Sequence, residues 1–455
     1  MALSKFESML KTNKVYFFDS SEFEEIIHHY LDNGRISLAK KAVKLSLEQH
    51  PTSVLLKLLK AELYIFEQEF LKAESLLNEL ESIEPTNDEI HIQRASIFSK
   101  NHEHKKAIDS LSYALQHTND EGDVCSLLAM EYLYLDDFKN ARSNFAKCID
   151  FDIEDYSSLY NIIYCFDMDE MHSDAVSYLK VYIDKNPYSE IAWHQLGRQY
   201  TVLKEFENAL RAFDYAVLID DSFIGGYLEK AKTLEVLDRN QEAIENYLIT
   251  LELDDATAFV YLRIGDCFKK LDNIQSAANY YKKAVNEDPL LEKGWLALTD
   301  VYFESETYSK SLYYIKKVIS IDEYNAVYWR KLGEINLKLS LFEEAVVAFK
   351  QCLSLGDKSI EVSLALIDVH YYIGDYREAY KSLQVAASYF DNNAVIAYRF
   401  FGVCMQLKNS NEAITHLKNA LVLDYDFHKV AIQLYPEFFA LEKVQSILET
   451  YKPSA

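Results

Sequence analysis

Glycine and proline are scarce in this sequence, which has 11 and 6 of them among 455 residues. Turn-rich β proteins and flexible interdomain linkers depend on both residues, so their scarcity argues against either architecture. No window approaches roughly 18 apolar residues, and we therefore expect no membrane-spanning helix. The N-terminal segment also lacks a continuous apolar run followed by a small-residue cleavage site, so we expect no secretory signal.

Cysteine is equally sparse, and no two cysteines form a Cys-X-X-Cys pair. The six are Cys125, Cys148, Cys165, Cys267, Cys352 and Cys404. Five of them fall at helix positions used for packing, which predicts free, buried thiols in a reducing compartment. Motifs of catalysis are also missing, because the chain has no glycine-rich phosphate loop, no HExxH and no GxSxG. We predict no catalytic residue, no metal ligand and no cofactor, and therefore a protein that is not an enzyme.

Positive charge is in short supply. The chain has 47 basic against 72 acidic residues and a formal net charge of −25. Such a surface repels nucleic acid and anionic membranes, so neither is an expected partner. Acidic chains with few aromatic residues are often disordered, but here aromatic residues reach 14% and recur periodically. We therefore expect a folded chain.

An alanine recurs every 34 residues along most of the chain. The ladder consists of Ala39, Ala73, Ala107, Ala141, Ala175, Ala209, Ala243, Ala277, Ser311, Ala345, Ala379 and Ala413. A small side chain at a constant position predicts that two helices approach closely at the same point of every unit. The period itself indicates an elongated array of repeats in place of several globular domains.

Each unit has the pattern of a helical hairpin. In the sixth unit, Trp193, Leu196 and Tyr200 follow helical spacing, a short polar turn comes next, and Ala209 and Phe213 begin a second helical pattern. Twelve such units are expected to begin near residues 20, 54, 88, 122, 156, 190, 224, 258, 292, 326, 360 and 394.

This pattern resembles the tetratricopeptide repeat, whose signature runs aromatic, Leu, Gly and Tyr on a first helix, then Ala, aromatic, Ala and Pro on and after a second. The aromatic position holds Trp193, Trp295 and Trp329, and the resemblance covers about nine-tenths of the chain. The glycine position is assigned to Gly197, Gly265, Gly333 and Gly402, and Pro51, Pro85, Pro187 and Pro289 end four units. The resemblance implies an all-α, right-handed α-solenoid of about twelve hairpins with N- and C-terminal capping segments.

The expected domain organisation has three parts. Residues 1–19 form an N-terminal capping segment, residues 20–427 form twelve repeats of 34 residues, and residues 428–455 form a C-terminal capping helix. Two departures from the period have predicted consequences. Ser311 and Thr299 replace smaller residues, so the ninth hairpin is expected to pack slightly apart. In the twelfth unit, Gly402 is displaced by one residue relative to Ala413, which predicts a turn shortened by one residue.

In proteins of the resembled family, the first helix of each hairpin lines a concave groove, and the residue after the glycine position faces into it. That position holds His28, Glu62, Ser96, Met130, Tyr164, Arg198, Lys232, Asp266, Asp300, Glu334, Asp368 and Val403. Four successive carboxylates, from Asp266 to Asp368, predict an acidic stripe in repeats 8–11. We predict that the stripe binds a basic or amphipathic segment of a partner protein, which makes the chain a cytoplasmic interaction scaffold or adaptor.

Two alternatives stay open. The aromatic and basic positions of repeats 5–7 could bind a small anion or phosphate ligand, since arginine and histidine suit such groups. These positions are Tyr160, Tyr164, His194, Arg198 and Lys232. The chain could also be an architectural spacer in a larger complex, with the apolar run Val15–Phe18 and the last helix as its contacts. The partner's identity and the oligomeric state do not follow from the sequence.

Overall fold

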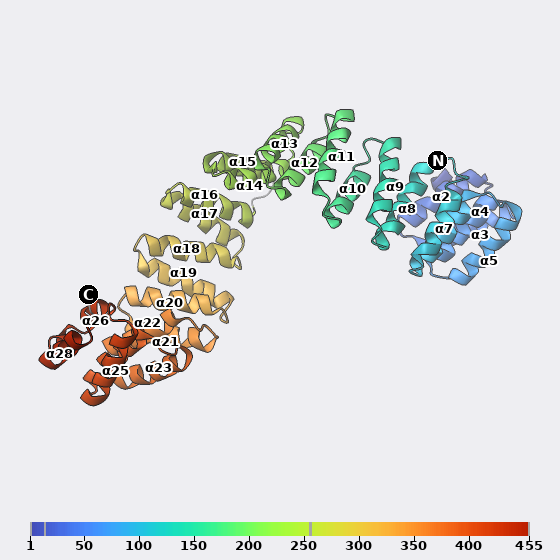
Figure 1. The fold of residues 1–455 in the computed structure, drawn as a ribbon. Coiled ribbons are helices and arrows are strands. Elements are labelled where there is room, and N and C mark those ends of the chain that lie inside the picture. The colour runs from blue at the N-terminus through green and yellow to red at the C-terminus, as the bar shows by residue number, and fades with distance from the viewer. Residues whose placement is uncertain (1, 13–14, 254–256, 454–455) are drawn as a thin grey trace. The chain divides into compact units, whose positions relative to one another are not determined.

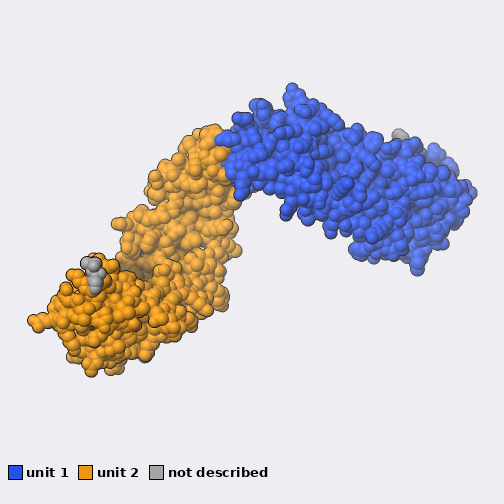
Figure 2. Space-filling model, in the orientation of Figure 1, with its two compact units in different colours: residues 1–233 blue, residues 234–455 orange. Residues whose placement is uncertain are grey.

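The computed structural model describes residues 2–12, 15–253 and 257–453, and every element of regular structure in those ranges is an α-helix. The all-α prediction is therefore confirmed. The chain divides into two compact units, residues 1–233 and residues 234–455, which are coloured separately in Figure 2. Each unit is a stack of helical hairpins (Figure 1). Over the described ranges, no helix is both long enough and apolar enough to span a bilayer.

The first unit contains α1 (Ala2–Thr12), α2 (Ser20–Asp32), α3 (Ile36–Gln49), α4 (Val54–Phe66), α5 (Phe70–Ile83), α6 (Asp88–Lys100), α7 (His104–Ala114), α8 (Glu121–Tyr134), α9 (Phe138–Phe151), α10 (Tyr156–Met168), α11 (His172–Lys185), α12 (Glu190–Val202) and α13 (Phe206–Ile219). The boundary between the units falls inside α14 (Ile224–Val236).

The second unit contains α15 (Asn240–Leu253), α16 (Ala258–Lys270), α17 (Ile274–Glu287), α18 (Glu292–Glu304), α19 (Tyr308–Ile321), α20 (Ala326–Lys338), α21 (Phe342–Ser354), α22 (Ile360–Tyr372), α23 (Tyr376–Tyr389), α24 (Ala394–Gln406), α25 (Ser410–Leu423), α26 (His428–Leu434), α27 (Pro436–Phe439) and α28 (Glu442–Thr450). Even-numbered helices from α2 to α24 begin within one residue of the predicted starts. We call these the A helices, and the odd-numbered helices from α3 to α25 the B helices.

Local sequence determines where the helices begin. The side chains of Ser53, Ser189 and Thr257 accept a hydrogen bond from a backbone N–H in the first turn of α4, α12 and α16, respectively. Such caps satisfy donors that have no partner within the helix. Serine, threonine, aspartate or asparagine stands at the N-cap of most A helices, whereas α18 has Leu291 there.

The turn between the A and B helices has a residue with positive φ in every repeat, again at intervals of 34 residues. These residues are Gly34, Gln68, His102, Asp136, Glu170, Lys204, Asp238, Asp272, Glu306, Ser340, Gly374 and Lys408. A left-handed residue ends the A helix and reverses the chain within a short turn. Only two of the twelve are glycine, so the period is not visible as a glycine pattern.

Every residue of the alanine ladder is fully buried, including Ser311. The hydroxyl of Ser311 donates to the carbonyl of Thr299 at 2.9 Å, so serine bridges the ninth hairpin directly. On the A helix, a glycine allows the same close approach of the two helices. A Cβ atom on Gly333 would lie 2.4 Å from the ring of Phe349.

The prediction for the twelfth repeat was wrong. The turn between α24 and α25 spans residues 407–409, which is as long as the turn between α12 and α13 at residues 203–205. Gly402 faces a different neighbour, since a Cβ atom there would lie 2.5 Å from the ring of Tyr435. The displacement therefore accommodates the C-terminal segment and leaves the hairpin's turn unchanged.

Additional helices cover both ends of the repeat array. At the N-terminus, Phe6 of α1 and Phe18 are fully buried against Phe23 of α2, with ring centroids of Phe6 and Phe18 5.8 Å apart. At the C-terminus, three short helices are present where we expected one. Pro436 cannot continue α26, because proline lacks the N–H that a helix interior requires. Phe439 nevertheless packs on Phe401 of α24, with ring centroids 5.2 Å apart.

Candidate partner-binding surface

Clefts between neighbouring A helices place two of the predicted carboxylates next to open space. Asp266 lines a cleft of about 490 Å³ formed by α16, α18 and the segment before α18. Asp368 lines a cleft of about 570 Å³ formed mainly by α20 and α22. Both carboxylates thus border open space in unit 2, and their role in binding a partner stays a prediction.

Two of the four carboxylates pair with an arginine of their own helix. Asp266 accepts from Arg263 at 3.2 Å and from the hydroxyl of Tyr281 at 2.9 Å. Glu334 pairs with Arg330 at 3.3 Å. Burial raises the pKa of Asp266, while Tyr281 and Arg263 act in the opposite direction. Both side chains are about one-third or more exposed, so each retains access to a ligand.

The other two carboxylates pair with a cation of the next A helix. Asp300 of α18 contacts Lys331 of α20 at 2.9 Å. Asp368 of α22 accepts two hydrogen bonds from Arg399 of α24, at 2.7 and 2.8 Å. Arg399 is only 8% exposed, so Asp368 supplies the negative charge that balances its buried guanidinium group. The four acidic positions are therefore neutralised in part by the chain itself, which the sequence pattern did not indicate.

The predicted aromatic and basic positions lie on three A helices of unit 1. Tyr160 and Tyr164 of α10 are exposed, and so is Arg198 of α12, which donates to Gln195 of its own helix at 3.3 Å. Lys232 of α14 forms an ion pair with Glu229 at 2.8 Å. The tyrosines and Arg198 thus remain accessible to a ligand.

His194 differs from the rest of this group because it is half-buried, with both ring nitrogens shielded from solvent in aromatic surroundings. Its ring lies 5.1 Å from that of Phe223 and 5.8 Å from that of Phe213. Neither ring nitrogen has a hydrogen-bond partner in the described structure. Burial lowers the pKa of His194 to about 4, with Arg198 and Lys232 contributing in the same direction. The imidazole is therefore neutral at pH 7 and cannot hold an anion by charge.

A cleft that the sequence did not single out lies on the A helices of repeats 1–3. Its volume is about 770 Å³, and its lining includes His28 of α2, Glu62 of α4 and Glu89 and Gln93 of α6. Gln93 is only 5% exposed and donates to Glu89 at 2.9 Å, but its Oε1 atom has no partner in the described structure.

Glu62 and Glu89 form no ion pair within the described residues, in contrast to the carboxylates of the predicted stripe. Burial raises the pKa of both, and for Glu89 the charge of Glu62 adds to the effect. Only Glu62 stands at the repeat position that we predicted to face the groove. Glu89 lies at a different repeat position, near the start of its helix. Comparing the same position in every repeat therefore could not show that the two residues are close.

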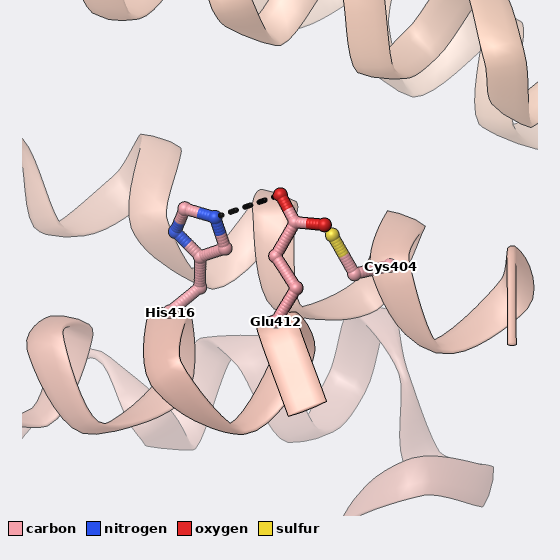
Figure 3. A group of neighbouring side chains, drawn as sticks. All are labelled: Cys404, Glu412 and His416. Atoms are coloured by element: carbon pink, nitrogen blue, oxygen red, sulfur yellow. Dashed lines mark ion pairs between the residues drawn. The ribbon is translucent and has the colours of Figure 1, made fainter. Parts of the chain in front are cut away.

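A cluster of potential metal ligands joins α24 and α25 (Figure 3). The ligand atoms of Cys404, Glu412 and His416 lie within 4.8 Å of one another. Glu412, however, already accepts hydrogen bonds from Tyr380 and from Asn409. Burial raises the pKa of the Cys404 thiol to about 12, and a metal requires the thiolate. We interpret the cluster as part of the network of hydrogen bonds and ion pairs around the half-buried Glu412.

Comparison with known proteins agrees with the repeated architecture. The profile of the tetratricopeptide repeat matches residues 122–152 and 260–289. Among curated proteins, the chain is 26% identical over 225 residues to the DnaJ homolog subfamily C member 7 homolog of Schizosaccharomyces pombe. That similarity covers 48% of this chain and 43% of the relative, so the chain spans less than half of that protein's length.

Three solved structures illustrate the range of similar chains. The crystal structure of MamA protein has 22% identity, covers 37% of this chain and 92% of its own, and gives a TM-score of 0.35. YrrB, titled a TPR protein with an unusual peptide-binding site, has 17% identity, coverages of 41% and 95%, and a TM-score of 0.36. The APC/C hetero-tetramer Cut9-Hcn1 has 14% identity, coverages of 99% and 93%, and a TM-score of 0.34. Scores of this size carry no information about what this chain binds.

Proposed function

Because this chain is a tetratricopeptide-repeat protein, we propose that it is a non-enzymatic scaffold that holds a segment of a partner protein against its A helices. The observation that supports this proposal is the series of clefts between successive A helices, which carry carboxylates at their edges. Helices held in place by the buried ladder form a rigid surface, which loses little entropy on binding. Its free, buried cysteines suit a reducing compartment such as the cytoplasm.

The bound segment is proposed to be basic or amphipathic. In unit 2 it would meet Asp266, Asp300, Glu334 and Asp368 along the predicted stripe. These carboxylates have internal partners, but a carboxylate offers about four acceptor positions and can take a further donor. In unit 1, Glu62 and Glu89 have no cation of their own, so a lysine or arginine of a ligand supplies one.

The test compares a neutralised stripe with a matched control. The variant D266N/D300N/E334Q removes three charges and keeps Asp368, whose loss would leave the buried Arg399 unpaired. The control D272N/E287Q/E306Q removes the same number of charges from exposed positions of unit 2 that form no ion pair within the described residues. Proteins captured from a lysate of the source cell are quantified by mass spectrometry for wild type, variant and control.

A partner that is retained by wild type and the control but lost from the stripe variant supports the proposal. Its purified form should then associate more slowly with the variant, and the salt dependence of that rate should be weaker, because exposed charges steer association. If all three proteins retain the same partners, the stripe is only a solvated surface.

The alternative of a small-anion site in repeats 5–7 is less well supported. His194 is neutral, and Lys232 already pairs with Glu229. Titration of inorganic phosphate into wild type and R198Q, followed by calorimetry, distinguishes the two functions. Binding that depends on Arg198 would favour the ligand site over the scaffold.

A further inference from the structure

A cavity of about 360 Å³ lies between α21, α22 and α23 in unit 2. Its walls are mainly apolar and include Leu353, Leu366, Ala386 and Phe390. The cavity reaches the surface, because two of its lining residues, Val385 and Tyr389, are 58% and 66% exposed. Ligand sites in proteins usually measure about 300–1,000 Å³, so the cavity is large enough for one bulky side chain.

The repeat pattern explains why space is open at this point. Ser363 of α22 stands 34 residues after Trp329 and 68 after Trp295, so it occupies the aromatic position of the hairpin. Ser363 lines the cavity. A hydroxymethyl group therefore replaces an indole that repeats 9 and 10 supply from their own A helices.

The partner of that aromatic residue is also missing. In repeat 9 the ring of Trp295 lies 6.0 Å from that of Tyr314, and in repeat 8 the ring of Tyr261 lies 6.2 Å from that of Tyr280. Both tyrosines correspond by period to Ser382 of α23, which also lines the cavity. Two serines thus face a space that two aromatic rings fill in repeats 8 and 9.

The residue whose carbonyl would accept the hydrogen bond of the missing indole is part of the cavity wall. The Nε1 atoms of Trp193, Trp295 and Trp329 donate to the carbonyl of the residue six positions earlier, at 3.0, 2.9 and 2.7 Å, respectively. For Ser363, that residue is Asp357, which lines the cavity. An indole from another molecule could therefore donate to the same carbonyl.

The charges at the cavity favour an acidic neighbour of that indole. Glu378 and Lys381 form an ion pair at 2.5 Å. Asp357 accepts from the backbone N–H of Ser359 at 2.7 Å. Lys358 is exposed and forms no ion pair with any residue that the structure describes. It is a cation available to a ligand on a chain whose net charge is −25.

We propose that this cavity binds a tryptophan side chain of a partner protein, with an acidic residue next to that tryptophan contacting Lys358. The incoming indole takes the position that Trp295 and Trp329 occupy in their own repeats. This site is distinct from the clefts beside Asp266 and Asp368, so it does not depend on the scaffold groove proposed above.

The probe is the capped tripeptide Asp-Trp-Asp, and its binding to the full chain is measured by calorimetry and by saturation-transfer NMR. We expect saturable binding, with transfer strongest at the indole protons. Replacing the probe's tryptophan by leucine should weaken binding at least tenfold, and replacing its aspartates by lysine should weaken it further than charge-neutral asparagine does. Equal binding of the tryptophan and leucine probes, or no binding at millimolar concentration, would overturn the proposal.

Two variants fill the cavity from within. S363W reproduces repeat 10, where Trp329 lies in a hairpin that has the small Ala348 at the position of Ser382. S382Y reproduces Tyr280 and Tyr314. Each should abolish binding of the probe, and S363W should raise the melting temperature because the chain supplies its own indole. Unchanged binding in both variants would place the probe elsewhere.

K358Q tests the charge separately. It should weaken the Asp-Trp-Asp probe about two- to fivefold, as expected for an exposed ion pair, and leave the corresponding Asn-Trp-Asn probe unaffected. If K358Q weakens the binding of both probes equally, Lys358 does not contact an acidic residue of the ligand.

Discussion

At the scale of single residues, the spacing of the hairpins is set by side chains that leave no room for another atom. Gly333 lies against the ring of Phe349, which is 1% exposed and cannot move into solvent. Gly122, in the first turn of α8, has its nearest neighbour at an ordinary van der Waals distance of 3.6 Å from a Cβ atom. Steric exclusion of a Cβ atom therefore explains the glycine at position 333 but not the glycine at position 122.

We predict that G333A destabilises the protein by about 1–3 kcal/mol, because overpacking outweighs the better helix propensity of alanine. G122A should have the opposite sign, since alanine is favoured over glycine in a helix by up to about 1 kcal/mol. Urea unfolding of both variants measures the difference. The double variant G333A/F349L should be less destabilised than the sum of the two single variants. If the two losses simply add, a clash between the new Cβ atom and Phe349 is not the cause.

His194 makes stability depend on pH. Its pKa in the folded protein, about 4, is below the 6.5 of an unperturbed histidine, so the unfolded chain binds more protons between these values. The stabilising contribution of the neutral His194 is therefore fully present above about pH 7, and it is lost as the pH falls from 6.5 towards 4. Linkage gives a loss of about 2 kcal/mol between pH 8 and pH 5 for this group.

Replacement by phenylalanine tests this prediction. H194F should be less sensitive to acid than wild type, because the replacement has no proton to gain and fits between Phe213 and Phe223. Melting temperatures are compared at pH 8 and pH 5, with H28Q as the control at an exposed position. If H194F and wild type lose equal stability on acidification, His194 is not the responsible group.

At the scale of the elements, the left-handed turn residue determines how each A helix passes into its B helix. Glu306 has φ of 56° and links α18 to α19. A residue with a Cβ atom is disfavoured in this conformation, whereas glycine is not. We predict that E306G raises stability by about 0.5–1 kcal/mol.

Two further substitutions show whether the backbone conformation is the cause. G374A, at φ of 82°, should lower stability by about 1 kcal/mol. K316G, at an exposed position inside α19, should also lower it by about 1 kcal/mol, because there glycine replaces a residue with regular helical φ. Denaturant midpoints provide the measurement, and an equal loss in E306G and K316G would contradict the explanation.

At the scale of the whole molecule, a solenoid exposes its core at both ends unless another element covers it. Tyr435 lies against Gly402, and Phe439 packs on Phe401. These contacts come from segments that have no hairpin pattern of their own.

A chain that ends at Asp424 should therefore expose the apolar face of α24. We expect faster hydrogen exchange in α24 and α25, little change in α2–α5, and self-association detected by light scattering. The control ends at Tyr451 and keeps α26–α28. A monomeric truncated chain with unaltered exchange in α24 would mean that the C-terminal helices are not a cap.

The sequence by itself determined the all-α class, the 34-residue period and the starts of the A helices, because each depends on residues that recur at a constant spacing. It also singled out Asp266 and Asp368, which line clefts between A helices in the structure. Those properties depend on neighbouring residues in the sequence, or they recur in so many repeats that comparing the repeats reveals them.

Only the tertiary structure decided the chemistry of the surface. The partners of Asp300 and Asp368 come from the next hairpin, and the proximity of Glu62 to Glu89 joins different positions of two repeats. The cavity beside Ser363 depends on a second serine in the following helix and on a loop before it. Such features arise where helices from different repeats meet. A pattern along the chain registers which residue is present at each position, whereas charge pairing and open volume depend on which residues face one another in space.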